Sequence, residues 1–373
     1  MRTRAAIIRE TPGKFEVVDI DLDDPRQGEI RVKLTATGLC HSDDHMQTGD
    51  LPVEHYPMVA GHEGAGVVES VGPNTPGWEV GDHVIFSFLP SCGRCRWCAE
   101  GLTNLCNFGA YTLRGARWDD QDSFRFSLNG QPVGQLCGLG TFAEHTLVST
   151  LSAIKVDKDL PLDKACLLGC GVGTGWGSAV YAAEVKPGEV VIVMGTGGIG
   201  INAVQGAAHA GASTVIAVDP VPLKREIAEQ VGATHSFATI EEADEFAKSI
   251  TEWQGADKAI VTVGVTTGEH VAQAFQAIRK AGTVVVTGLG DMNDTKGLPI
   301  NPWQIAMLQK RIQGTLYGDC NAAADIPRQV RMYRDGQLKL DELITKTYRL
   351  DDIVTAYEDM HAGKNMRGVI LFD

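Results

Sequence analysis

Near its middle, the chain reads Val190-Val191-Ile192-Val193-Met194-Gly195-Thr196-Gly197-Gly198-Ile199-Gly200. The first five residues are apolar, as expected of a parallel strand that is buried on both faces. The glycines that follow match the pattern Gly-x-Gly-x-x-Gly, and residues 199–210 suit a helix. A strand, a glycine turn and a helix in this order predict the first unit of a doubly wound parallel sheet.

The same alternation continues towards the C-terminus. Apolar runs predict further strands at residues 214–218, 258–263, 283–287 and 312–316, and a helix at 222–231. The acidic run at residues 241–245 is typical of a solvated helix start. The predicted fold class is therefore α/β, with a Rossmann dinucleotide-binding domain over residues 173–316.

The glycine turn and one acidic residue predict a bound dinucleotide. A glycine at the first position permits the tight turn, the second lets the backbone approach a pyrophosphate, and the last lets the helix pack closely. The N-terminus of that helix offers N–H groups to phosphates. Asp219 ends the next strand, where its carboxylate would accept hydrogen bonds from a ribose 2′-hydroxyl and repel a 2′-phosphate, so NAD is favoured over NADP. The expected cofactor-binding residues in the turn are Gly195, Gly197, Gly198, Ile199 and Gly200.

The residues before this domain differ from it in composition and in their predicted secondary structure. Residues 1–172 are rich in glycine, proline and short β-type runs, with strands expected at 30–34, 66–71 and 83–86 and turns at 72–74 and 79–82. This first domain is predicted to be mainly β, with barrel-like strand spacing. Residues 317–373 leave the strand–helix alternation and are expected to return to the first domain.

The composition excludes several classes of protein. A net charge of −14 over 373 residues argues against nucleic acid and anionic membranes as partners, since both need a basic surface. The sequence contains neither a signal-peptide pattern nor an apolar run long enough to span a membrane, so a cytoplasmic location is expected. Nine cysteines are an odd number, which favours metal binding over a disulfide framework.

Four of these cysteines form a compact motif. Cys92, Cys95, Cys98 and Cys106 lie within fifteen residues, with glycines at 93 and 101 that ease the turns. Four thiolates can surround zinc tetrahedrally and leave no open position, as in structural zinc sites. The loop at residues 92–106 is therefore predicted to be a structural zinc loop without a chemical role.

Three further candidate ligands, Cys40, His62 and Cys170, each lie beside glycine or a turn. Two sulfurs and one imidazole would leave a fourth zinc position open, which is the mark of a catalytic site. These residues are far apart in sequence, and spacing alone cannot join them.

A family resemblance does join them. The chain resembles the zinc-dependent medium-chain alcohol dehydrogenases over nearly its whole length, through Gly38-Leu39-Cys40-His41-Ser42-Asp43, Gly61-His62-Glu63-Gly64, the four-cysteine loop, residues 166–171 with Thr174-Gly175, and the glycine turn with Asp219. The resemblance implies a GroES-like catalytic domain made from two chain segments. It also implies a catalytic zinc on Cys40, His62 and Cys170, with Glu63 beside the metal and Asp43 orienting His62.

The resemblance implies further roles. Ser42 would hydrogen-bond the alcohol oxygen, and the proton would pass through the nicotinamide ribose to His45 and then to water. Cofactor contacts are implied for His41 and Arg367 at the pyrophosphate, Lys224 near the adenosine ribose, and Thr174 and Ile199 on the nicotinamide side. Apolar pocket positions are implied at Phe88, Leu136 and Leu289, which favours an uncharged alcohol.

Two branches of the family are similar to this chain. Glutathione-dependent formaldehyde dehydrogenases share the four-cysteine loop, but Ala110 and His45 stand where that branch usually has arginine and tyrosine. The tail, with Asp325-Ile326-Pro327, Tyr348-Arg349-Leu350 and residues 363–370, resembles the actinobacterial nicotinoprotein alcohol dehydrogenases that reduce N,N-dimethyl-4-nitrosoaniline (NDMA). That second resemblance implies an NAD(H) that stays bound and is recycled by an external electron acceptor.

The expected activity is thus hydride transfer between a primary or secondary alcohol or aldehyde and NAD. S-(hydroxymethyl)glutathione dehydrogenase is the alternative enzyme, and a nucleotide-sensing scaffold with one zinc is the alternative of another class. Two zinc ions per chain and a homo-oligomer, a dimer or tetramer formed through the edge of the nucleotide-domain sheet, are implied by the family. Cys137, Cys166 and Cys320 have no assigned role beyond packing.

Overall fold

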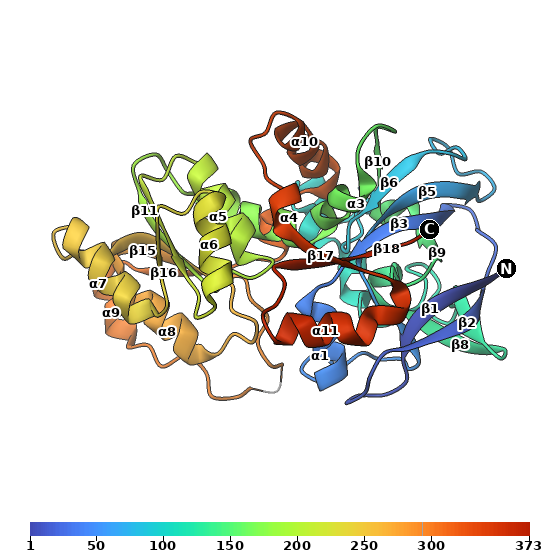
Figure 1. Ribbon diagram of the computed structural model, residues 1–373, viewed down its shortest axis with the longest axis horizontal. Coiled ribbons are helices and arrows are strands. Elements are labelled where there is room, and N and C mark those ends of the chain that lie inside the picture. The colour runs from blue at the N-terminus through green and yellow to red at the C-terminus, as the bar shows by residue number, and fades with distance from the viewer. Residues whose placement is uncertain (293) are drawn as a thin grey trace. The chain divides into compact units, whose positions relative to one another are not determined.

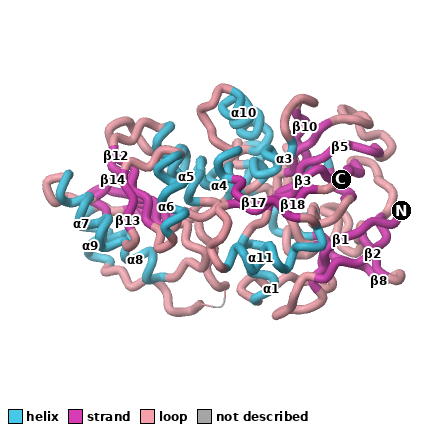
Figure 2. The backbone as a smooth tube through the Cα atoms, in the orientation of Figure 1, coloured by secondary structure: helices cyan, strands magenta, loops and turns pink. Residues whose placement is uncertain are grey.

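The computed structural model describes residues 1–292 and 294–373, whose elements are labelled in Figures 1 and 2. Contacts divide the chain into two compact units. The first holds residues 1–170, 321–334 and 343–373, and the second holds residues 171–320 and 335–342. The domain limits expected from the sequence, after residues 172 and 316, stay a prediction. The contacts group residues 335–342 with the second unit, whereas the sequence analysis assigned all of 317–373 to the first domain.

The first unit is built from two sheets. One is a closed barrel of β1 (Arg2–Ile8), β2 (Glu16–Leu22), β7 (Phe126–Leu128), β8 (Gln131–Gln135) and β4 (Met58–Val59). The other runs in the order β10 (Ala153–Val156), β6 (His83–Phe86), β5 (Glu63–Val71), β3 (Glu29–Gly38), β18 (Arg367–Leu371) and β17 (Ile344–Tyr348), with β9 (His145–Ser149) paired to β3. The three strands predicted here lie in β3, β5 and β6, so the mainly β prediction is confirmed.

The C-terminal segment returns to this unit, as the sequence predicts. Strand β18 pairs antiparallel with β3, and Val369 lies opposite Gly38. Helices of the first unit are α1 (His41–Thr48), α2 (Arg96–Ala99), α3 (Leu162–Ala165), α10 (Ala322–Arg334) and α11 (Ile353–His361). The pairing joins residues more than 300 positions apart in one sheet.

Three charged side chains form a buried ion network inside the first unit. One carboxylate oxygen of Glu29 accepts hydrogen bonds from Arg117 at 3.0 Å and Arg125 at 2.8 Å, and all three side chains are buried. Burial acts to raise the pKa of Glu29, but the two guanidinium groups outweigh it and lower that pKa. Arg125 also donates to Gln135, which ends β8. Removing one of these three side chains would leave an unpaired charge buried in the protein. The network therefore stabilises the first unit only when all three side chains are present.

The second unit is the predicted doubly wound sheet. Its parallel strands follow the order β13 (His235–Phe237), β12 (Thr214–Val218), β11 (Val190–Met194), β14 (Ala256–Val261), β15 (Ile278–Val286) and β16 (Arg311–Gly314). Chain order therefore reverses beside β11, which is the order of dinucleotide-binding sheets. The helices are α4 (Gly171–Gly177), α5 (Gly200–His209), α6 (Pro222–Gln230), α7 (Ile240–Ile250), α8 (Gly268–Ala277) and α9 (Pro302–Leu308).

Most elements agree with the sequence prediction to within a few residues, and β13 is an additional short strand. The acidic run opens α7, where Thr239 and Glu242 form a capping box. Short 3-10 turns are η1 (Thr103–Leu105), η2 (Asn107–Tyr111), η3 (Leu136–Gly138), η4 (Thr150–Ser152), η5 (Cys166–Gly169), η7 (Tyr317–Asp319), η8 (Asp341–Leu343) and η9 (Leu350–Asp352), and η6 (Ser178–Ala182) is a π-helix. Among the described residues, no helix combines the length and apolar character needed to cross a membrane.

Candidate metal centres and cofactor loop

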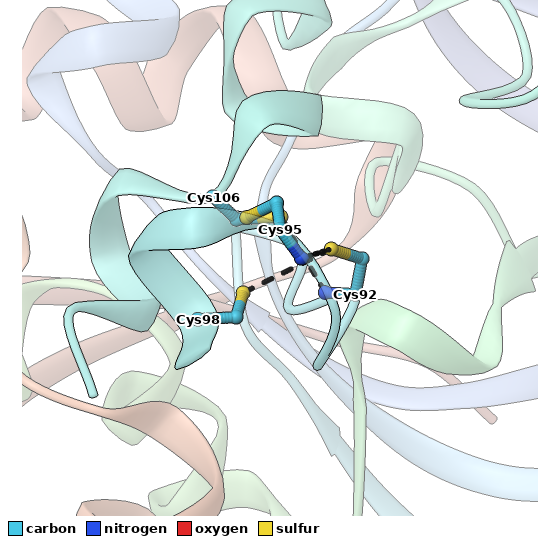
Figure 3. Close-up of side chains that lie close together, drawn as sticks. All are labelled: Cys92, Cys95, Cys98 and Cys106. Atoms are coloured by element: carbon cyan, nitrogen blue, oxygen red, sulfur yellow. Dashed lines mark hydrogen bonds between the residues drawn. The ribbon is translucent and has the colours of Figure 1, made fainter. Parts of the chain in front are cut away.

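The four-cysteine loop gathers its sulfurs at one point, as Figure 3 shows. Cys95 precedes α2, Cys98 lies within it, and Cys106 follows η1. The four sulfur atoms all lie within 4.8 Å of one another. The Sγ atoms of Cys92 and Cys98 are 3.9 Å apart. Sulfurs at about 2.3 Å from one zinc ion in a tetrahedron would be about 3.8 Å apart, so the spacing fits zinc.

Backbone groups prepare this loop to hold thiolates. The N–H of Cys92 donates to the sulfur of Cys106 at 3.4 Å, and the N–H of Cys95 donates to the sulfur of Cys92 at 3.3 Å. Backbone N–H groups of Cys98 and Asn107 lower the pKa of Cys95 to about 6. A thiol with so low a pKa is ionised at neutral pH, which is the form that binds metal.

A second group of metal-binding side chains lies in the first unit. Cys40, the adjacent pair His62 and Glu63, and Cys170 come from three separate segments, and one ligand atom from each residue lies within 4.8 Å of the others. Cys40 stands directly before α1, Glu63 begins β5, and Cys170 follows η5. The register of β3 against β5 places Gly38 opposite Glu63, and this pairing brings Cys40 beside His62. Tertiary pairing thus joins the residues that sequence spacing cannot.

The orientation of His62 is set by Asp43. Asp43 is fully buried, lies 3.2 Å from Nδ1 of His62 and accepts the N–H of Gly61 at 2.7 Å. Because Nδ1 faces this carboxylate, Nε2 is left for the cysteine side. The expected role of Asp43 in orienting a metal-bound His62 stays a prediction, which this contact supports.

The charges of the group fit a divalent cation. Hydrogen bonding from Cys170 and the charge of His62 hold the pKa of the Cys40 thiol well below its usual range. Although burial opposes a charged imidazole, Asp43 and Cys40 raise the pKa of His62 well above its usual value. Both pKa shifts indicate surroundings that favour positive charge beside the Cys40 sulfur, and a bound metal ion would supply that charge. Sulfur and imidazole donors at such distances suit zinc.

An ion pair that the sequence analysis missed lies beside this group. The guanidinium of Arg367, at the start of β18, donates to the carboxylate of Glu63, and both side chains are buried. A side chain at position 38 would clash with them, because a Cβ on Gly38 would meet the Glu63 carboxylate at 2.2 Å. Cys40 and Glu63 both act to raise the pKa of Arg367. The expected pyrophosphate contact of Arg367 stays a prediction, and the structure adds this second contact.

The expected relay residues lie on α1. The Oγ atom of Ser42 is 3.6 Å from the sulfur of Cys40. His45 is buried in the last turn of the helix, and its ring lies 6.4 Å from that of His41, measured between centroids. Nδ1 of His45 lies 3.2 Å from a carboxylate oxygen of Asp50, a partner to which the sequence analysis gave no role.

The apolar positions named for the substrate pocket differ in their surroundings. The ring of Phe88 meets the ring of His62 edge-on, with centroids 5.9 Å apart. Leu136 is buried in the main core of the first unit, whereas Leu289 belongs to the second unit and is exposed. Cys137, Cys166 and Cys320 are buried, and their role in packing stays a prediction.

In the second unit, the glycine turn joins β11 to α5. A Cβ on Gly200 would lie 1.8 Å from the carbonyl oxygen of Gly195, so only glycine lets the helix approach the turn. Apart from Gly197 and its two chain neighbours, no atom of residues 1–292 and 294–373 lies within 4 Å of the place where a Cβ on Gly197 would be, which leaves room beside the backbone there. Asp219 follows β12, and its carboxylate accepts the N–H groups of Thr196 and Val221, each at 2.9 Å. Lys224 lies in α6 with its Nζ 4.0 Å from that carboxylate.

Two family models match the chain. The model described as "Alcohol dehydrogenase GroES-like domain" matches residues 26–158, and the model described as "Zinc-binding dehydrogenase" matches residues 198–333. The first match covers both groups of candidate metal ligands except Cys170, and the second covers the last three residues of the glycine turn and Asp219.

Similar proteins cover the chain from end to end. An NDMA-dependent alcohol dehydrogenase of Amycolatopsis methanolica is 49% identical, over 100% of this chain and 99% of that protein. An S-(hydroxymethyl)glutathione dehydrogenase of Synechocystis is 36% identical, over 99% of this chain and 100% of that protein. The crystal structure of benzyl alcohol dehydrogenase from Acinetobacter calcoaceticus superposes with a TM-score of 0.91 at 30% identity, with both chains fully covered.

Proposed function

Because the chain belongs to the zinc-binding alcohol dehydrogenases, which are oxidoreductases, we propose that it transfers hydride between an uncharged alcohol or aldehyde and NAD. The observation that carries this proposal is the convergence of Cys40, His62 and Cys170 beside Glu63 in one buried group. Such a set of two sulfurs and one imidazole gives zinc three ligands and leaves one position for an alcohol.

Each residue of this group has a proposed task. Cys40, Cys170 and Nε2 of His62 hold the ion, and Asp43 keeps the imidazole turned towards it. Zinc bound there acts as a Lewis acid that lowers the pKa of an alcohol hydroxyl. Ser42 holds the alcohol oxygen, and His45 takes up the proton that oxidation releases. Phe88, packed against His62, forms an apolar wall that favours an uncharged alcohol over a charged substrate.

The second unit is proposed to bind NAD. The turn at residues 195–200 and the N-terminus of α5 suit a pyrophosphate, and Asp219 suits an adenosine ribose without a 2′-phosphate. NAD held by these residues would supply a hydride acceptor for alcohol oxidation. His41, Thr174, Lys224 and Arg367 are the further proposed cofactor contacts.

We also propose that NAD(H) stays bound through many turnovers and is recycled by an external electron acceptor. The support is the full-length similarity to a protein whose name states NDMA dependence, together with the tail motifs. The alternative, S-(hydroxymethyl)glutathione dehydrogenase, is supported by relatives of lower identity. It is disfavoured by Ala110 and by His45, and an assay for glutathione dependence separates the two.

Native mass spectrometry of the purified protein, together with absorbance spectra before and after alcohol is added, tests the proposed function. The expected result is two zinc ions and one NAD(H) per chain in a dimer or tetramer, with reduced nicotinamide absorbance appearing after alcohol is added. Cys40→Ser is expected to lose one zinc and all alcohol oxidation, whereas Cys106→Ser is expected to lose the other zinc. A wild-type protein that carries only the four-cysteine zinc, or that turns over only with glutathione, would contradict the proposal.

A further inference from the structure

We propose that Asp50 is a positioning residue for His45, holding its ring in one orientation and stabilising its protonated form during alcohol oxidation. The proposal rests on the proposed function, because it requires His45 to accept the proton that oxidation releases. No role for Asp50 follows from the metal ligands, the cofactor loop or the resemblance to the family.

The first support is the pairing of a buried base with a partly exposed acid. His45 is 5% exposed, and its Nδ1 lies 3.2 Å from Oδ2 of Asp50. The side chain of Asp50 is 32% exposed, so the carboxylate contacts water as well as the imidazole. A carboxylate facing Nδ1 keeps the hydrogen on that atom and leaves Nε2 as the proton acceptor.

The second support is that the loop holding Asp50 is bound to the backbone of His45 itself. The N–H groups of Gly49 and Leu51 donate to the carbonyl oxygen of His45 at 3.0 and 3.1 Å. Gly49 ends α1 in the left-handed region at φ 95°, which reverses the chain there. Thr48 donates its hydroxyl to Oδ2 of Asp50 at 2.7 Å. The carboxylate therefore cannot move far from the ring that it faces.

The charges around His45 agree with this role. Hydrogen bonds from Thr48 and His45 lower the pKa of Asp50, so its carboxylate is ionised at neutral pH. The neighbouring His41 has its ring 6.4 Å away, and Asp44 on the same helix is turned to His361, at 2.7 Å. Within residues 1–292 and 294–373, Asp50 supplies the negative charge that directly faces His45. A fixed negative charge favours the imidazolium that forms when the proton arrives.

Four single variants of the full-length enzyme test the proposal, namely Asp50→Asn, Asp50→Ala, His45→Gln and the control Glu54→Gln. Two double variants that combine each Asp50 substitution with His45→Gln complete the set. Asp50→Asn removes the charge but keeps an oxygen that can accept from Nδ1, whereas Asp50→Ala removes both. Glu54→Gln removes a carboxylate four residues away that faces Arg114 at 4.0 Å. The measurements are kcat for alcohol oxidation against pH, and the tautomer of His45 by 15N NMR of histidine-labelled protein, assigned by the signal missing in His45→Gln.

Asp50→Asn is expected to shift the acid limb of the pH profile by about 0.5 to 1 pH unit towards lower pH, because the imidazolium loses its countercharge. The plateau rate should fall about three- to tenfold, since a less basic imidazole is a weaker proton acceptor. The plateau rate of Asp50→Ala should fall further than that of Asp50→Asn, and the NMR spectrum of Asp50→Ala should show both tautomers of His45. Neither substitution should alter the profile when His45 is already glutamine, and Glu54→Gln should match the wild type.

Two results would overturn the inference in different ways. If His45→Gln changes the pH profile but both Asp50 variants keep the wild-type profile and tautomer, Asp50 does not position His45 while the proposed function stands. If His45→Gln itself leaves the profile unchanged, the proton relay within the proposed function is wrong, and the role of Asp50 is wrong with it.

Discussion

Asp219 shows how one side chain serves both the fold and the cofactor site. Its two carboxylate oxygens accept backbone N–H groups from the glycine turn and from the residue preceding α6. The carbonyl oxygen of Asp219 accepts from Arg225 at 2.7 Å. The acidic residue therefore ties the end of β12 to the turn after β11, at the same place where a ribose is expected. Loss of its charge affects loop order and cofactor choice together.

Asp219→Asn is expected to reduce the preference for NAD over NADP by about tenfold or more. Two unit charges about 4 Å apart near a surface repel by roughly 1 to 4 kcal/mol, and this repulsion of a 2′-phosphate is removed. The quantity to measure is the ratio of the two dissociation constants, because loop disorder weakens both cofactors and cancels in the ratio. An unchanged ratio would show that Asp219 only supports the turn.

Helix α11 supports the helix that carries the candidate relay. Tyr357 donates its hydroxyl to the carbonyl oxygen of Cys40 at 3.3 Å, and one turn later His361 faces Asp44 at 2.7 Å. Positions four residues apart share a helix face, so both contacts point to α1. The ring of Tyr357 packs on Phe15 and Phe142, with centroids 5.2 and 6.3 Å away. Phe142 in turn donates its N–H to the carbonyl of Ala60, close to His62.

Tyr357→Phe is expected to remove the hydrogen bond to the carbonyl oxygen of Cys40 while keeping the aromatic packing. One lost hydrogen bond should lower the free energy of unfolding by about 1 kcal/mol. The zinc proposed at Cys40 should be lost to a chelator several times faster, whereas zinc in the four-cysteine loop should be lost at the wild-type rate. Tyr56→Phe is the matched control, because the buried hydroxyl of Tyr56 has no hydrogen-bond partner within residues 1–292 and 294–373. Equal zinc loss from Tyr357→Phe and Tyr56→Phe would contradict this role of α11.

On the scale of the whole molecule, the sheet of the second unit ends in an uncovered strand. Strand β16 lies at one edge of the sheet, and an edge strand offers unpaired backbone groups to another chain. Large apolar side chains gather in and around α9 and β16, and they are all exposed: Leu298, Trp303, Ile305, Met307 and Leu316. Exposed apolar groups beside a free edge favour the proposed assembly of two copies through this strand.

Met307→Lys is expected to weaken that assembly by about tenfold or more. A two-fold interface would place the new charge on both copies, and a central apolar contact typically contributes over about 1 kcal/mol. The measurement is subunit dissociation by native mass spectrometry over a dilution series. Trp253→Lys is the control, because Trp253 is as exposed but lies outside α9 and β16. If both variants dissociate alike, or if the wild type is monomeric, β16 is not the interface.

Local sequence predicted the elements well and the site only in part. The apolar run at residues 190–194 is β11 without change, and the acidic run at 241–245 opens α7. The four-cysteine loop converges because its ligands are only a few residues apart. Such features depend on neighbours along the chain, so periodicity and spacing are enough to find them.

What only the tertiary structure decided is the set of contacts between distant segments. Cys40 meets His62 through the register of β3 on β5, and Arg367 reaches Glu63 because β18 adds to the same sheet. The partners of Tyr357 likewise depend on packing. The local sequence pattern predicts which element a residue belongs to and which face of that element is buried. Which residue it contacts across that face depends on how the elements pack together. The sequence alone therefore determined the two kinds of domain and the ligand types, and packing determined which side chains act as a group.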